Sequence, residues 1–120
     1  KGSSGWYLPS IGQWWDIFEN LGEAKGLTAL KDNETTSSNI AISLSGESVF
    51  ENLNTCLKAA SSSVDEFESS KNYWSSSEHN RNNKGLVYAH SVSLTATSLT
   101  TTGATKTSNS NRRVRCVLSF

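Results

Sequence analysis

The apolar residues of this chain change their spacing halfway along it, and this change limits the possible fold most. In the first half they recur every three or four residues, which is the period of an amphipathic helix. Ser10 and Gln13 form a capping box that opens one helix, and Gly22 is its predicted C-cap. A second helix is predicted from about Glu47 to Ala60. The apolar faces consist of Trp14, Ile17, Phe18 and Leu21 in the first helix and Phe50, Leu53, Leu57 and Ala60 in the second.

The second half of the chain shows the period-two alternation of β-strands. The predicted strands are Tyr73–Ser77, Leu86–Leu94 and Arg113–Phe120, and a short apolar alternation precedes them at Ile40–Leu44. The inward positions are Leu86, Tyr88, His90, Val92 and Leu94 in one strand and Val114, Cys116, Leu118 and Phe120 in the last. Residues 95–112 are predicted to be a polar surface segment. Two helices followed by strands predict an α+β domain.

Composition and charge limit the class of partner. The chain has 120 residues, enough for one domain, and carries 22 Ser, 11 Thr and 11 Asn, so its surface is rich in hydroxyl and amide groups. Residues 1–70 hold ten acidic and four basic side chains and residues 71–120 hold one and seven, which leaves a net charge of zero. A neutral balance argues against nucleic-acid binding. No apolar run reaches the roughly 20 residues that span a bilayer, so we expect no membrane insertion.

The sequence contains no recognisable catalytic or metal-binding pattern, so we expect neither an enzyme nor a cofactor. His79 and His90 are eleven residues apart, and His90 is predicted to be a buried or half-buried side chain rather than a ligand. Asp65, Glu66 and Glu68 lack the spacing of a calcium loop. Cys56 and Cys116 fall on or beside apolar stripes, so they are either small buried hydrophobic residues or a disulfide between a helix and a strand.

Three motifs occur in order along the chain. They are Gly5-Trp6-Tyr7-Leu8-Pro9-Ser10-Ile11-Gly12-Gln13-Trp14, Tyr73-Trp74-Ser75-Ser76-Ser77-Glu78 and Arg113-Val114-Arg115-Cys116-Val117. In these motifs the chain resembles the Lcl C-terminal domain family over residues 5–120. The resemblance implies a C-type-lectin-like fold, with two helices packed on a small twisted antiparallel sheet with long loops. It also implies that Trp6, Trp14, Trp74, Glu78 and Arg115 are framework residues, with Glu78 in a buried or half-buried ion pair with a framework arginine.

The resemblance is closest to the domains of pilus-tip adhesins and to the variable proteins of diversity-generating retroelements. In those proteins the stretch between the second and third motifs varies, and here it covers residues 79–112. The calcium-binding motifs of sugar-binding C-type lectins are absent, so no metal is implied. The predicted ligand-binding residues are His79, Asn80, Arg81, Asn82, Asn83, Lys84, Ala89, Ser91, Ser93, Thr95, Thr97, Thr100, Thr101, Thr102, Thr105, Thr107, Ser108, Asn109, Ser110 and Asn111.

The sequence therefore predicts a non-enzymatic module that displays a variable polar surface on a rigid scaffold. The expected partner is a glycan or a polar protein receptor on another cell, because hydroxyl and amide groups suit polar targets. We expect residues 1–5 to be a linker, and the rest to be one domain of a larger protein on a cell surface, a pilus tip or a virion. The alternative is an assembly module of a surface fibre, or a phage receptor-binding protein, with one fixed partner.

Overall fold

The first helix begins where its capping box predicts. The computed structural model describes residues 5–27, 40–44, 46, 48–78, 88–107 and 112–118, and in it α1 spans Ile11–Asn20. The Ser10 hydroxyl accepts a hydrogen bond from the Gln13 amide at 3.2 Å, and the Gln13 side chain accepts one from the Ser10 amide at 2.9 Å. These two bonds satisfy amides that the first turn of a helix leaves without partners, so the predicted start is confirmed.

α1 ends one residue earlier than predicted, and Gly22 has a different role from the predicted one. Leu21, not Gly22, is the C-cap, and Gly22 is needed where the two helices meet. A Cβ atom on Gly22 would lie 2.7 Å from the Phe18 carbonyl oxygen and 2.7 Å from Val49 Cγ1. Val49 begins α2, which spans Val49–Ala60, so the absence of a side chain at Gly22 lets α2 approach α1.

The strands form two sheets in the described part of the chain. The strands are β1 (Trp6–Tyr7), β2 (Ala41–Ser43), β3 (Asn72–Glu78), β4 (Tyr88–Leu94), β5 (Ser98–Thr105), β6 (Arg112–Arg113) and β7 (Val117–Leu118). Five of them form a sheet in the order β2-β5-β4-β3-β6, in which only β3 and β6 are parallel, and β1 pairs antiparallel with β7. This arrangement of helices and strands confirms the α+β class.

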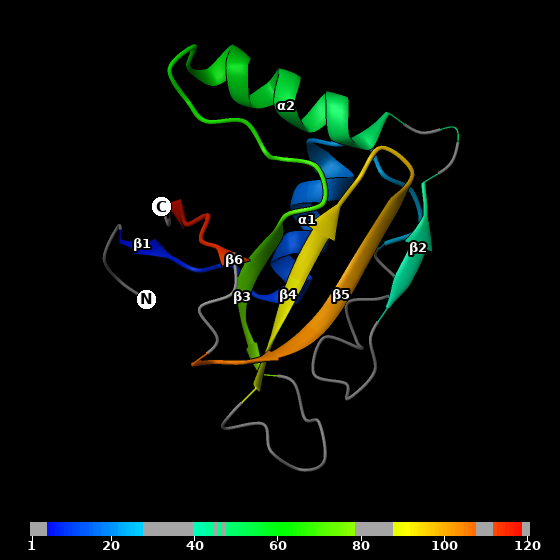
Figure 1. Ribbon diagram of the computed structural model, residues 1–120. Coiled ribbons are helices and arrows are strands. Elements are labelled where there is room, and N and C mark those ends of the chain that lie inside the picture. The colour runs from blue at the N-terminus through cyan, green and yellow to red at the C-terminus, as the bar shows by residue number, and fades with distance from the viewer. Residues whose placement is uncertain are drawn as a thin grey trace.

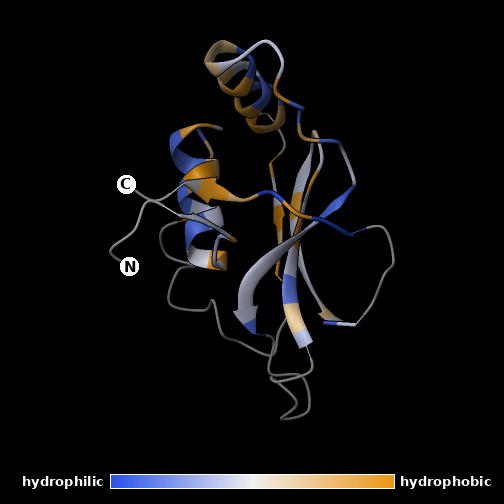
Figure 2. Ribbon diagram, turned by 90° about the vertical axis from the view of Figure 1, so that its left-hand side faces the viewer, coloured by the Kyte–Doolittle hydropathy of each residue, from blue (hydrophilic) through white to orange (hydrophobic). Residues whose placement is uncertain are grey.

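The helices cover one face and one end of the five-stranded sheet. In Figure 1, α1 lies behind β3 and β4, and α2 crosses the upper end of the sheet. Figure 2 shows the same arrangement from the side, with α1 on one side of the sheet and no helix on the other. We call the face that α1 covers the inner face and the opposite one the outer face.

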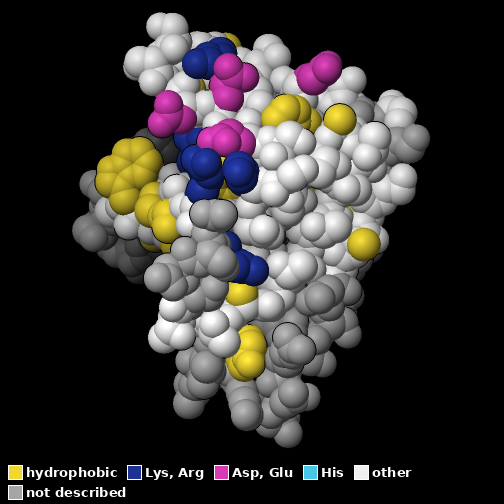
Figure 3. Space-filling model, viewed as in Figure 1, with side chains coloured by type: hydrophobic (Ala, Val, Ile, Leu, Met, Phe, Trp, Pro, Cys, Tyr) yellow, Lys and Arg dark blue, Asp and Glu magenta, His cyan; other side chains and the backbone are white. Residues whose placement is uncertain are grey.

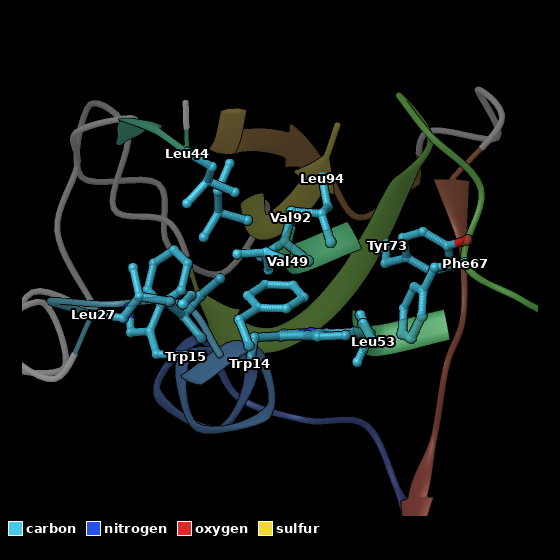
Figure 4. Close-up of a cluster of buried hydrophobic side chains, with 14 residues drawn as sticks. Trp14, Trp15, Leu27, Leu44, Val49, Leu53, Phe67, Tyr73, Val92 and Leu94 are labelled. Carbon is cyan, nitrogen blue, oxygen red and sulfur yellow. The ribbon is translucent and has the colours of Figure 1, made fainter. Parts of the chain in front are cut away.

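The core lies between α1, the start of α2 and the inner face. Trp14, Trp15 and Phe18 from α1 and Val49 and Leu53 from α2 are almost fully buried. The sheet and the loops contribute Leu27, Leu44, Phe67, Tyr73, Val92, Leu94 and Leu99. Figure 4 shows Trp14 and Trp15 below Leu44, Val49, Val92 and Leu94, with Phe67 and Tyr73 at one side. The ring centroids of Phe67 and Tyr73 are 4.9 Å apart, which is a favourable edge-to-face distance.

Residues 95–112 are not all surface loop, which corrects the prediction. They include β5, whose residues 99–105 pair with β4 over its whole length, from Tyr88 opposite Thr105 to Leu94 opposite Leu99. The hydroxyl-rich composition predicts a surface loop. Threonine is β-branched, however, and suits a strand, and here it forms an interior strand of the sheet. The Thr101 side chain is buried on the inner face, where its hydroxyl accepts a hydrogen bond from the Ile40 amide at 2.9 Å.

The last predicted strand, Arg113–Phe120, is also wrong in part. The chain pairs with β3 through β6 and then with β1 through β7, so it leaves one sheet for the other between residues 113 and 117. Val114 lies in this crossing and is 62% exposed, although the alternation placed it inward. Residues 119–120 lie outside the described residues.

The two cysteines match neither alternative. Cys56 on α2 and Cys116 in the crossing to β7 are both exposed, and both are free thiols. They are therefore neither small core residues nor a disulfide.

Candidate functional site

The outer face of the sheet is built from small polar side chains. Residues that face each other across antiparallel strands point to the same side, so the register places Trp74, Ser91 and Thr102 in one row. Asn72, Ser93 and Thr100 form the next row by the same rule. Figure 3 views this face and shows mainly uncharged polar side chains and backbone over the sheet.

Arg112 is stacked on the outer face and covers one of the predicted ligand-binding residues. Its guanidinium carbon lies 5.3 Å from the centre of the Trp74 ring, and its Nε atom donates to the Ser91 hydroxyl at 3.4 Å. The Ser91 and Thr102 hydroxyl oxygens are 3.1 Å apart and share a hydrogen bond. Strand parity correctly predicted that Ser91 lies on the outer face. The prediction that its side chain is displayed is wrong, because Ser91 is 0% exposed.

A bulge in β3 accounts for the three consecutive serines of the Tyr-Trp-Ser-Ser-Ser-Glu motif. Trp74 pairs with Ser91 and Glu78 pairs with Ala89, so residues 75–77 of β3 face a single residue, His90, on β4. A bulge of this kind bends a strand and leaves backbone groups without ladder partners. The Ser75 hydroxyl donates to the His90 carbonyl oxygen at 2.9 Å and accepts from the Ser77 amide at 3.2 Å.

The same bulge attaches the segment before α1 to the sheet. The Ser77 hydroxyl accepts a hydrogen bond from the Ile11 amide at 2.9 Å, at the first turn of α1. The Ser76 amide donates to the Pro9 carbonyl oxygen at 2.9 Å. These two bonds bring Leu8 beside the bulge.

An open hollow of about 310 Å³ lies at this junction, and we call it the Trp74 hollow. It is lined by Leu8, Trp74, Ser75, Ser76, Ala89 and Lys106. Leu8, Trp74 and Ala89 are the apolar members of this lining, and Ser76 is the exposed hydroxyl. An aromatic ring, hydroxyl groups and a charged group therefore line the same depression.

An exposed ion pair borders the Trp74 hollow. Lys106 Nζ lies 2.8 Å from Glu78 Oε1, and the two side chains are 40% and 51% exposed. The resemblance implied a buried or half-buried pair between Glu78 and an arginine, and both the partner and the burial are wrong. The register explains the difference, because Glu78 ends β3 beside Ala89 and Lys106 follows directly after β5.

A second, larger hollow of about 710 Å³ lies between residues 65–68 and 113–116. Two of its charged side chains pair with each other, because Arg113 is 2.7 Å from Glu68, and Arg115 donates to the backbone carbonyl oxygen of Asp65 at 2.6 Å. The Arg115 guanidinium also stacks on Phe67, 4.7 Å from the ring centre. Figure 3 shows this cluster of opposite charges above the outer face. We interpret it as a clamp that fixes the crossing from β6 to β7.

The predicted ligand-binding residues fall into three displayed groups, one buried group and one set outside the described residues. Ser93, Thr100 and Thr102 are partly exposed on the outer face, Thr95 and Thr97 lie at the β4–β5 turn, and Thr105 and Thr107 lie at the other end of β5. Ala89, Ser91 and Thr101 are buried and are not displayed, although Ala89 lines the Trp74 hollow. His79, Asn80, Arg81, Asn82, Asn83, Lys84, Ser108, Asn109, Ser110 and Asn111 lie outside the described residues.

The sequence analysis missed Leu8, Ser76 and Lys106 as site residues. A signal for Lys106 was present, because it is the only charged residue from Thr95 to Asn111. Leu8 and Ser76 carry no such signal, since their place in the hollow depends on hydrogen bonds between segments far apart in the chain.

Metal-binding groups and membrane-spanning helices are both absent from the described ranges. There, no group of three or more His, Cys, Asp and Glu side chains could hold a metal ion. None of the helices in the described ranges is long and apolar enough to cross a membrane.

Comparison with known proteins adds no relative. The chain matches no protein-family model, and no curated protein or solved structure is significantly similar to it. The fold and the site define a small α+β domain with one polar sheet face that neither described helix covers and an open, aromatic-lined hollow at one end of it.

Proposed function

We propose that this domain is a non-enzymatic binding module that recognises a polar receptor through its outer face. We place it on the outside of a cell or virion, as part of a larger surface protein such as a pilus-tip adhesin. The motifs shared with the Lcl C-terminal domain family support this proposal. So do the two helices packed on a small twisted sheet, the arrangement that a C-type-lectin-like fold would have.

The observation that carries the proposal is the difference between the two faces of the sheet: one is buried and apolar, and the other is polar and partly exposed. Val92, Leu94 and Leu99 are buried on the inner face, whereas Ser93 and Thr100 are partly exposed on the outer face. Outer side chains can therefore change without altering the core that holds the strands in place. This property is what a variable recognition surface requires.

A single added charge on the outer face tests the proposal. Thr100→Glu places a carboxylate among hydroxyl groups, and Thr55→Glu, at an exposed position on α2, is the matched control. Both variants and the parent domain are labelled and applied to a printed array of neutral and charged glycans and to intact bacterial and animal cells. We expect the parent and Thr55→Glu to bind the same targets and Thr100→Glu to lose at least about tenfold in affinity. Equal binding by Thr100→Glu, or no binding by the parent, would contradict the proposal.

One observation favours the alternative of an assembly module. Trp6 on β1 is 71% exposed, which is unusual for so large an apolar side chain. If the domain serves assembly, it self-associates as its concentration rises, and Trp6→Ala abolishes that association. Sedimentation velocity over a range of concentrations measures this association, and a domain that stays monomeric throughout would contradict the assembly function.

A further inference from the structure

We propose that the Trp74 hollow binds one neutral pyranose unit of a glycan, an inference that rests on the proposed binding function and specifies its ligand. Its volume of about 310 Å³ lies at the lower end of the range for small-molecule sites, roughly 300 to 1,000 Å³. A hollow of this size suits a single sugar ring rather than an extended chain.

The lining matches the two surfaces of a sugar ring. A pyranose has an apolar face of C–H groups and a polar edge of hydroxyl groups. Leu8, Trp74 and Ala89 supply apolar area, and the indole ring of Trp74 adds a flat, rigid surface. The exposed Ser76 hydroxyl offers both a donor and an acceptor to the polar edge.

The ion pair at the border selects for a neutral ligand. Lys106 donates to Glu78 at 2.8 Å, so the cation is already balanced by an anion. A sugar hydroxyl can accept a hydrogen bond from Lys106 and donate one to Glu78 at the same time. Because the two charges largely offset each other, the pair offers a charged ligand no net attraction to compensate for the desolvation of its charge, a cost that a neutral polyol does not have.

The floor of the hollow is held in place before any ligand arrives. Arg112 stacks on the Trp74 ring at 5.3 Å, and the Trp14 indole donates to the Trp74 carbonyl oxygen at 3.3 Å. The Ser76 amide is bonded to the Pro9 carbonyl oxygen, which fixes the neighbouring Leu8. A site fixed in this way loses little conformational entropy on binding, which matters for a ligand as small as one sugar.

The test is a titration followed by the indole N–H resonance of Trp74 in a proton–nitrogen correlation spectrum. The probes are the methyl pyranosides of glucose, galactose and mannose, compared with methyl glucuronide and glucosamine. We expect at least one neutral pyranoside to shift the Trp74 resonance with a Kd of about 1 mM. The charged sugars should bind at least about tenfold more weakly. No shift with any neutral pyranoside, or a preference for a charged sugar, overturns the inference.

Two single variants and one charge exchange localise the binding without touching the core. Ser76→Phe fills the hollow from an exposed position and should abolish the Trp74 shift, whereas Ser62→Phe, exposed in the loop after α2, should leave it unchanged. The exchange Glu78→Lys with Lys106→Glu preserves the neutral pair and should preserve neutral-sugar binding within about threefold. Binding that survives Ser76→Phe, or charged-sugar binding that follows the exchange, overturns the inference.

The failure of this inference differs from the failure of the proposed function. If the domain binds cells in a manner sensitive to Thr100→Glu and no pyranoside shifts Trp74, only the sugar site is overturned. If an uncharged peptide shifts Trp74 and pyranosides do not, the hollow holds a side chain of a protein receptor and the sugar class is again overturned. If no cell, glycan or pyranoside is bound, both proposals fail.

Discussion

At the scale of single residues, serine does more in this chain than make its surface polar. Ser75 and Ser77 are both buried at the β3 bulge, where their hydroxyl groups bond to backbone groups. Ser75 donates to the His90 carbonyl oxygen, and Ser77 accepts from the Ile11 amide. Ser76, between them, is exposed and contributes only its amide to the framework. Adjacent identical residues therefore have different roles, and substitution distinguishes them.

Replacement of Ser77 by alanine should destabilise the domain. The change removes the acceptor of the buried Ile11 amide at the start of α1, and a buried donor without a partner costs about 1–3 kcal/mol. Urea unfolding followed by tryptophan fluorescence measures the loss. The control, Ser76→Ala, should stay within about 0.5 kcal/mol of the parent, because its side chain is exposed. A Ser77→Ala protein as stable as its control would show that Ile11 finds another acceptor.

At the scale of elements, the approach of α2 to α1 depends on Gly22. Gly22→Ala forces a Cβ atom to 2.7 Å from a backbone oxygen of α1, which the chain relieves only by moving the helices apart. Overpacking of this kind costs about 1–3 kcal/mol.

Gly26→Ala is a control that introduces backbone strain without a steric clash. Gly26 has φ +76°, but a Cβ atom added there would meet no other atom within 4 Å, so its replacement should cost about 1 kcal/mol through strain alone. Thermal unfolding should rank Gly22→Ala below Gly26→Ala, and near-ultraviolet circular dichroism of the buried tryptophans should change only in Gly22→Ala. The opposite ranking would mean that the helices do not meet at Gly22.

The elements also show what local sequence can predict. The start of α1 was predictable because Ser10 and Gln13 are three residues apart and satisfy each other. The strand β5 was not, because Thr101 is buried against Ile40, 61 residues earlier in the chain. The Trp74 hollow was equally inaccessible to prediction, since Glu78 meets Lys106 only through the pairing of β3, β4 and β5.

At the scale of the whole molecule, no disulfide links α2 to the segment before β7. Cys56 and Cys116 are free and exposed, so both should react with a thiol reagent in the native protein. The assay compares thiols titrated before and after denaturation, without reductant, and the two values should agree. If neither titration detects a thiol, the two cysteines form a disulfide, which would contradict the structure.

The outer and inner faces also predict where natural variation should fall. If the domain is a diversified receptor-binding surface, sequencing of this gene from one natural population should find replacements at Ser93, Thr100 and Thr102. Ser77 and Thr101, which hold buried hydrogen bonds, should be invariant. Replacements spread evenly over both faces, or none at all, would contradict a diversified outer face.

The pairing of β1 with β7 has a mechanical consequence. Trp6 faces Leu118 and Tyr7 faces Val117, so the chain enters and leaves the domain at one place. A pull on both ends separates the short β1–β7 ladder one pair at a time, before the load reaches the larger sheet. Under tension the β1–β7 ladder therefore separates first, while β3, β4 and β5 keep the outer face in shape.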